Sequence, residues 1–183
     1  MSPLELRQAV VFAARFEYAT QLFCLPSSPR VGSSLTALDL DPDKPLPAGV
    51  KPLENAARVH EYWSDVLPWG TPSQDYPKEW CGAFCLFCIH RALLGPDVFW
   101  HGGFAARWLR QLQPGQLPQP GDVAYFSKYQ HHAIVEDVHA DARTFDSVDG
   151  NQGPGILRHA GRKLSAAAAF YSIEPLIEAK GAT

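Results

Sequence analysis

The sequence predicts an α+β fold in which N-terminal helices pack on an antiparallel sheet of about five strands. Apolar residues recur at helical spacing up to Leu112, whereas short runs rich in β-branched and aromatic residues follow from Gly121 onward. Hydrophobic residues make up 46% of the 183 residues and charged residues 19%, which is typical of a globular protein with its own core.

Four helices are predicted in the N-terminal part. The Ser-Pro-Leu-Glu sequence at residues 2–5 is a capping box, and apolar residues at helical spacing continue from it to about Phe23. A second helix is expected over residues 52–67. A third begins near Cys81 and ends at a glycine–proline pair, and a fourth covers residues 104–112.

Short strands are predicted in the C-terminal part, separated by glycine, proline and aspartate. They cover residues 123–126, 132–138, 143–148, 156–159 and 170–173. Because the intervening turns are short, consecutive strands are expected to pair antiparallel.

A proline-rich segment at residues 25–52 divides the predicted helices. An irregular stretch of this length is unusual inside a compact domain, and we interpret it as a lid, a tether or a wrap around the surface. The expected organisation is an N-terminal helical extension at residues 1–70 and a domain at residues 71–183, which together form one compact unit.

The charge pattern argues against two classes of partner. The net charge is −3 and no cluster of Lys and Arg stands out, so nucleic-acid binding is not expected. No apolar run approaches the roughly 18 residues of a membrane helix, so membrane insertion is not expected. The N-terminus lacks the pattern of a signal peptide, which predicts synthesis in the cytoplasm.

Cys81 is the strongest candidate for chemistry. It is predicted in the first turn of its helix, where the helix dipole lowers a thiol pKa and a free backbone N–H can face an oxyanion. Cys85 and Cys88 follow on the same helix face, which suits buried free thiols better than a disulfide.

Two histidines and two polar residues downstream could complete such a site. His131 and His132 open a strand, and alternation sends their side chains to opposite faces, so only one is expected to face the cysteine as general base. Asp149 and Asn151 follow the next strand. Either one, if it accepts a hydrogen bond from the imidazole, would orient the ring; ordinary turn chemistry explains each equally well.

Zinc binding is the rival chemistry. Cys85 and Cys88 have CxxC spacing and a histidine pair follows, but structural zinc sites place this spacing in a knuckle rather than inside an aromatic-rich helix. The chain has no second CxxC. We therefore expect neither a metal nor any other cofactor.

Four motifs together resemble the CHAP and NlpC-type amidases and peptidases of the papain-like superfamily. They are Trp80-Cys81-Gly82-Ala83-Phe84, Pro120-Gly121-Asp122-Val123-Ala124-Tyr125-Phe126, His131-His132-Ala133-Ile134-Val135 and Val148-Asp149-Gly150-Asn151. They occur in the order and with the spacing of that family, and the resemblance covers about residues 76–173. The resemblance implies that residues 71–183 form a papain-like catalytic domain.

The resemblance also implies roles for individual residues. Cys81 would be the nucleophile, and His131, which stands two positions before the small residue Ala133, the general base. Asp149 or Asn151 would orient the imidazole, since both residue types serve in relatives. The family's oxyanion helper before the cysteine is not plain here; Gln74 and Tyr76 are candidates.

Relatives of this type usually cleave amide bonds in bacterial peptidoglycan, as lysins, remodelling enzymes or secreted antibacterial effectors. The expected substrate is therefore a peptidoglycan peptide, and the expected site of action is the cell wall after non-classical release or injection. An immunity protein or a delivery partner would accompany an injected effector. Two alternatives stay open: a papain-like protein deamidase or transamidase toxin, and a catalytically inactive cell-wall-binding module.

Overall fold

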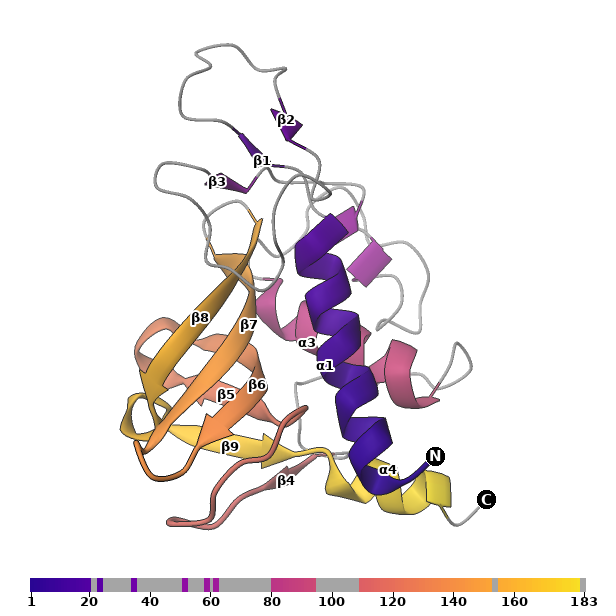
Figure 1. Ribbon diagram of the computed structural model, residues 1–183, viewed down its shortest axis with the longest axis vertical. Coiled ribbons are helices and arrows are strands. Elements are labelled where there is room, and N and C mark those ends of the chain that lie inside the picture. Colours follow the sequence, from indigo (N-terminus) through magenta and orange to yellow (C-terminus); the bar gives the residue numbers. More distant parts are fainter. Residues whose placement is uncertain are drawn as a thin grey trace.

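The structure is a computed structural model that describes residues 1–20, 23–24, 34–35, 51–52, 58–59, 61–62, 80–94, 109–152 and 155–181. Within these ranges the α+β prediction is confirmed, because an N-terminal helix and a second helix pack on an antiparallel sheet (Figure 1). Most of the proline-rich segment at 25–52, together with Gln74 and Tyr76, lies outside the described residues.

The main sheet has six strands, where about five were expected, in the order β4-β9-β5-β6-β7-β8. Its strands are β4 (Arg110–Gln111), β5 (Val123–Phe126), β6 (His131–His139), β7 (Thr144–Gln152), β8 (Gly155–Lys163) and β9 (Ala169–Ser172). A second, small sheet has the order β2-β1-β3 and consists of β1 (Phe23–Cys24), β2 (Ser34–Leu35) and β3 (Lys51–Pro52).

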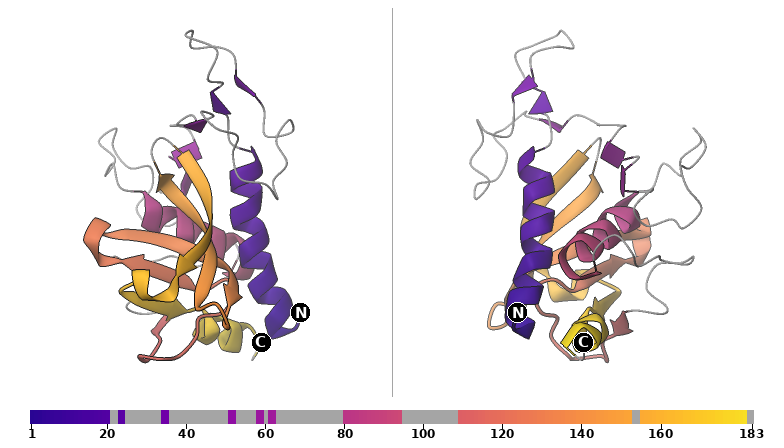
Figure 2. Two further views of the ribbon diagram at one scale, coloured as in Figure 1. Left: turned by 60° about the vertical axis from the view of Figure 1, so that its left-hand side comes forward. Right: turned by 90° about the vertical axis from the view of Figure 1, so that its right-hand side faces the viewer.

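Helices α1 (Pro3–Thr20) and α3 (Cys81–Ile89) pack against each other and against the main sheet (Figure 2). The capping box is present, since the backbone N–H of Glu5 donates to Ser2 Oγ and that of Ser2 donates to the Glu5 carboxylate. α1 ends at Thr20, earlier than expected, because Phe23 already pairs in β1. α3 continues as a π-helical turn over His90–Leu94; the glycine–proline pair at 95–96, where the helix is predicted to end, lies outside the described residues.

Alternating residues of the strands build a core on each face of the sheet. Val123, Ile134 and Val148 point toward the helices and pack with Phe84 and other buried residues of α1 and α3. The opposite face carries a second cluster, formed by Ala124, Phe126, Ala133, Val135, Phe145 and Leu164. The period of two along each strand therefore separates the helix-facing side chains from those on the other face.

A buried arginine ties α1 to the sheet and to the C-terminal helix α4 (Glu174–Gly181). Arg7 donates to Asp122 Oδ1 at 2.7 Å and to Glu174 Oε2 at 2.6 Å. Arg7 and Asp122 are almost fully buried, so each needs the other to offset its desolvation. The first helix thus shares its packing with the sheet rather than standing apart from it.

Near the ends of the sheet, one secondary-structure prediction was wrong and one helix was not predicted. The fourth helix, predicted to reach residue 112, is absent there, because Arg110–Gln111 form strand β4 and pair with β9; residues 101–108 lie outside the described residues. Helix α4 was not predicted, because it is short and follows a strand without an intervening turn signal.

The site residues Asp149 and Asn151 lie within strand β7 and not in the turn that the sequence suggested. β7 runs to Gln152, so Gly150 is a strand residue and not a turn residue. Its lack of a side chain is explained by the packing of α3 on β7. A Cβ on Gly150 would approach Phe84 and Trp80 to between 2.6 and 2.8 Å, so the glycine allows α3 to press against β7.

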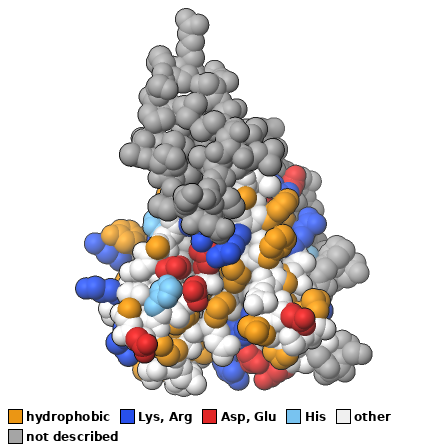
Figure 3. All heavy atoms as spheres, in the orientation of Figure 1, with side chains coloured by type: hydrophobic (Ala, Val, Ile, Leu, Met, Phe, Trp, Pro, Cys, Tyr) orange, Lys and Arg blue, Asp and Glu red, His pale blue; other side chains and the backbone are white. Residues whose placement is uncertain are grey.

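The described part of the surface has charges of both signs. On the face drawn in Figure 3, acidic and basic side chains are interspersed between hydrophobic ones. No helix among the described residues has both the length and the apolar character required to cross a bilayer.

Candidate active site

The sulfur of Cys81 lies where the start of α3 meets the start of β6. Cys81 is the first residue of α3, so its backbone N–H has no acceptor within the helix. Its side chain is buried, and Sγ lies 3.9 Å from the carbonyl oxygen of Gln130, just before β6. Gln130 has a left-handed backbone (φ 49°), which turns the chain into the strand at this point.

Both histidines reach the thiol, contrary to the expectation that only one would face it. His132 Nδ1 is 3.8 Å from Cys81 Sγ, and His131 also hydrogen-bonds the thiol. The physical reason is that the sulfur lies at the N-terminal end of β6, against the backbone of Gln130 and His132, and not over one face. Side chains on both faces of the strand can approach a group at its end.

His131 is the histidine held by a carboxylate. Its Nε2 lies 2.9 Å from Asp149 Oδ2, and both side chains are almost fully buried. With Nε2 engaged by Asp149, the hydrogen bond between the ring and the Cys81 thiol falls to Nδ1. The three residues therefore form a thiol–imidazole–carboxylate array in the order that nucleophilic catalysis requires.

Asp149 is itself surrounded by donors. Ser147 Oγ donates to its Oδ1 at 2.6 Å, and Arg162 Nη2 lies 2.8 Å from its Oδ2. Ser147 precedes Asp149 by two positions on the same face of β7, and Arg162 comes from the neighbouring strand β8. These contacts satisfy a carboxylate that would be costly to bury alone.

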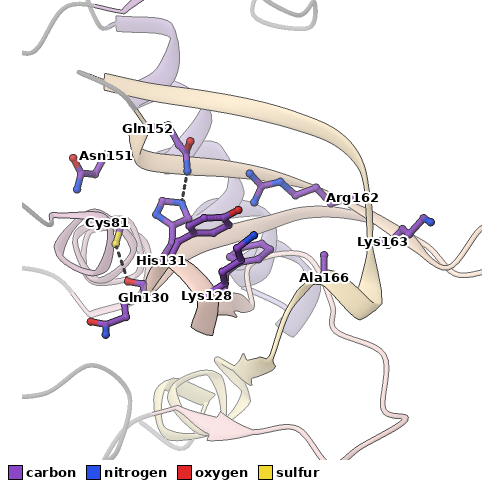
Figure 4. Close-up of a pocket in the computed structure, with 11 residues that line it drawn as sticks. Cys81, Lys128, Gln130, His131, Asn151, Gln152, Arg162, Lys163 and Ala166 are labelled. Carbon is purple, nitrogen blue, oxygen red and sulfur yellow. Dashed lines mark hydrogen bonds between the residues drawn. The ribbon is translucent and has the colours of Figure 1, made fainter.

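Gln152 is a further neighbour of the imidazole. Its amide Nε2 is 3.0 Å from His131 Nε2, and Figure 4 shows the His131 ring between Cys81 and Gln152. Asn151 also lies beside this group, and its positive φ of 60° coincides with an irregularity in the pairing of β7 with β8. Of the two residues weighed from the sequence, Asp149 makes the 2.9 Å hydrogen bond to His131, whereas Asn151 lines the pocket.

Cys81 and His131 open onto a pocket of about 820 Å³. Its described lining also includes Phe126, Lys128, Tyr129, Gln130, Asn151, Gln152, Arg162, Lys163 and Ala166. His131 lines this pocket, whereas His132 lies on the helix-facing side of β6 and packs its ring against Tyr125. A substrate in the pocket would thus meet the sulfur and the His131 ring together.

The pKa values of the pair have moved in opposite directions. Burial raises the pKa of the Cys81 thiol, but hydrogen bonds from the side chains of His131 and His132 and from the His132 backbone outweigh it and lower the pKa to about 6. Burial lowers the pKa of His131, but the hydrogen bond and charge of Asp149, together with the thiolate, raise it to about 9. Between these values the pair is a thiolate and an imidazolium.

The two other described cysteines behave as core residues, as the sequence predicted. Cys85 and Cys88 are free and fully buried, and burial raises the pKa of each thiol well above its ordinary value. Within the described ranges, no group of three or more His, Cys, Asp and Glu side chains is arranged to hold a metal ion.

Sequence reasoning missed three residues of this site: Arg162, Gln152 and Ser147. Ser147 carries a detectable signal, because residues two apart on a strand share a face with Asp149. Arg162 and Gln152 depend on how β7 pairs with β8. That pairing contains two register shifts, which cannot be counted from the sequence.

Comparison with protein families, curated proteins and solved structures finds no match to this chain.

Proposed function

We propose that this protein is a cysteine amidohydrolase or endopeptidase with a papain-like fold. The observation that carries the proposal is the array of Cys81, His131 and Asp149 at the wall of the pocket. A lowered thiol pKa in a site with a histidine base and a buried carboxylate is the arrangement that activates cysteine for attack on carbonyls.

The reaction would proceed in two halves. The Cys81 thiolate attacks the carbonyl carbon of an amide, and the backbone N–H of Cys81, at the first position of α3, would stabilise the resulting oxyanion. The His131 imidazolium donates its Nδ1 proton to the departing amine as the C–N bond breaks, which leaves a thioester. A water then gives a proton to His131 and attacks the thioester, which releases a carboxylic acid and restores the thiolate.

The proposed substrate is an amide bond of bacterial peptidoglycan, acted on at the cell wall after release or injection. This part of the proposal rests on the similarity of the four sequence motifs to CHAP and NlpC-type hydrolases. The order of the elements is compatible with it, since the nucleophile begins a helix while the base and its carboxylate lie on adjacent antiparallel strands.

Alkylation by iodoacetamide tests the activated thiolate. At pH 7 a thiol with a pKa of about 6 is about 90% ionised, against about 3% for an ordinary cysteine. After allowance for the lower nucleophilicity of a weakly basic thiolate, Cys81 should react about two- to threefold faster than an ordinary thiol, and much faster than Cys85 and Cys88, whose thiol pKa values are raised by burial. Mass spectrometry of peptides from Cys81, Cys85 and Cys88 gives the relative rates, and equal rates would refute the proposal.

Incubation with purified sacculi tests the substrate. The wild-type protein should release soluble muropeptides, and the Cys81→Ala variant should release none. Cys88→Ala is the matched control, since it removes a buried thiol of the same helix away from the pocket. Ammonia release from proteins without muropeptide release would instead identify a deamidase, and full activity of Cys81→Ala would end the hydrolase proposal.

A further inference from the structure

The pocket beside Cys81 differs in charge from the protein as a whole. The chain has a net charge of −3, yet the described lining contains Lys128, Arg162 and Lys163 and no aspartate or glutamate. These three side chains come from two separate elements. Lys128 lies in the 3₁₀ turn after β5, and Arg162 and Lys163 lie at the end of β8. The fold therefore gathers positive charge at the mouth of the site.

One of the three cations is already balanced. Arg162 pairs with the buried Asp149 at 2.8 Å, and its guanidinium carbon lies 4.7 Å from the centre of the Phe126 ring. In the active form, the thiolate offsets the His131 imidazolium and Asp149 offsets Arg162, so these four groups sum to zero. They cannot neutralise the lysines.

Lys128 and Lys163 are the two cations left over. Both are exposed, and neither forms an ion pair among the residues that the structure describes. Lys128 instead lies with Nζ 5.1 Å from the centre of the Tyr129 ring, a contact that leaves its charge available. A bound anion could therefore receive both ammonium groups without breaking an existing ion pair.

The position of these lysines relates to the reacting bond. In Figure 4, Lys128, Arg162 and Lys163 all lie on the far side of the His131 ring from Cys81, with Lys128 nearest to that ring and Lys163 farthest from it in that view. A substrate whose amide carbonyl carbon lies at the Cys81 sulfur and that fills the pocket would extend along this side, where Lys128 and Lys163 line it. The part of the substrate that lies there is the part on which the two lysines would act.

We propose that Lys128 and Lys163 bind a free carboxylate on the part of the substrate that extends past His131, away from the scissile amide. This inference rests on the proposed function and narrows its substrate class to acidic peptides whose flanking carboxylate is not amidated. Replacing that carboxylate by a carboxamide removes the charge and keeps the shape, so discrimination between the two forms would come from the lysines.

Binding to the Cys81→Ala variant tests the inference without turnover. The probes are synthetic peptidoglycan stem peptides in which each carboxylate in turn is replaced by a carboxamide, and calorimetry gives Kd for each. One replacement should weaken binding about tenfold, which is about 1.4 kcal/mol and within reach of two partly exposed ion pairs. The others should change Kd less than threefold.

Variants then assign the effect to the lysines. In the Cys81→Ala background, Lys128→Gln with Lys163→Gln should weaken the all-carboxylate peptide by the same factor and leave the sensitive carboxamide peptide unchanged. Arg110→Gln, which removes an exposed positive charge on β4 outside the described lining, is the control and should alter neither. Raising the salt concentration should weaken only the binding of the carboxylate form.

Three results would overturn the inference: equal binding of all peptides, an unchanged preference in the double lysine variant, or no binding of any peptide at millimolar concentration. None of these results touches the hydrolase proposal, which stands if the wild-type protein releases muropeptides and fails if Cys81 is not selectively alkylated.

Discussion

Replacing Asp149 by asparagine isolates the role of the buried carboxylate. The substitution keeps the size of the side chain but removes the charge that faces His131 at 2.9 Å and Arg162 at 2.8 Å. The pKa of His131 is raised from 6.5 to about 9, with Asp149 as the main cause of the increase. At about 1.4 kcal/mol for each pKa unit, this increase corresponds to roughly 3 kcal/mol in favour of the imidazolium.

Losing most of that free energy should return the pKa of His131 toward its ordinary value and favour a neutral thiol–imidazole pair. The expected loss in kcat/KM at pH 7 is about 100-fold, since about 2.7 kcal/mol is a factor of about 100. The alkaline limb of the pH profile should move from about 9 to near 7. The profile is measured both for hydrolysis and for alkylation of Cys81, because alkylation reports the thiolate without the later steps.

Asp146→Asn is the matched control for this experiment. Asp146 lies on the same strand, three positions earlier, and its contacts are with His139 and the backbone of Gly161, away from the pocket. That variant should keep the wild-type pH profile. If Asp149→Asn retained activity within fivefold and an alkaline limb near 9, Asp149 would not be the group that sustains the imidazolium.

Three further predictions concern the same site and its packing. The wild-type pH profile should be bell-shaped, falling below about 6 as the Cys81 thiolate is protonated and above about 9 as His131 loses the proton that the leaving amine needs; a single limb would contradict this. His131→Ala should lower kcat/KM at least 1000-fold, and His132→Ala only about tenfold, since only His131 lines the pocket and bonds Asp149; the reverse order would assign the base to His132. Gly150→Ala should lower the free energy of unfolding by about 3 kcal/mol in urea titrations, because its new Cβ would overlap Phe84 and Trp80; a cost below about 1 kcal/mol would show that α3 can move away.

The sequence predicted most of the fold because its signals are local. The capping box at Ser2, the helix beginning at Cys81 and the alternation along β6 each depend on neighbours within a few residues, and the structure contains all three. Strand β4 could not be found in this way. It consists of two residues that become a strand only by pairing with β9, some sixty positions later in the chain.

The candidate site was predictable to a similar extent and for the same reason. Cys81 begins a predicted helix, His131 begins a strand, and Asp149 lies in the next strand. The structure brings the three side chains together. The approach of His132 to the sulfur was not predictable, because alternation describes the faces of a strand and not a group at its N-terminal end. Arg162 escaped notice because its contact with Asp149 depends on shifts in the β7–β8 register.

Gly150 couples this chemistry to the interior of the protein. The residue before it supplies the carboxylate, and the two rings that would touch its Cβ belong to Trp80, which directly precedes Cys81, and to Phe84, one turn after it. Any exchange of either ring for one of another size would therefore change the spacing between the Cys81 thiol and the Asp149 carboxylate as well as the packing. A substitution that makes this part of the interior more stable would thus also move the thiol or the carboxylate, and a substitution that changes their spacing would also change the stability of the interior.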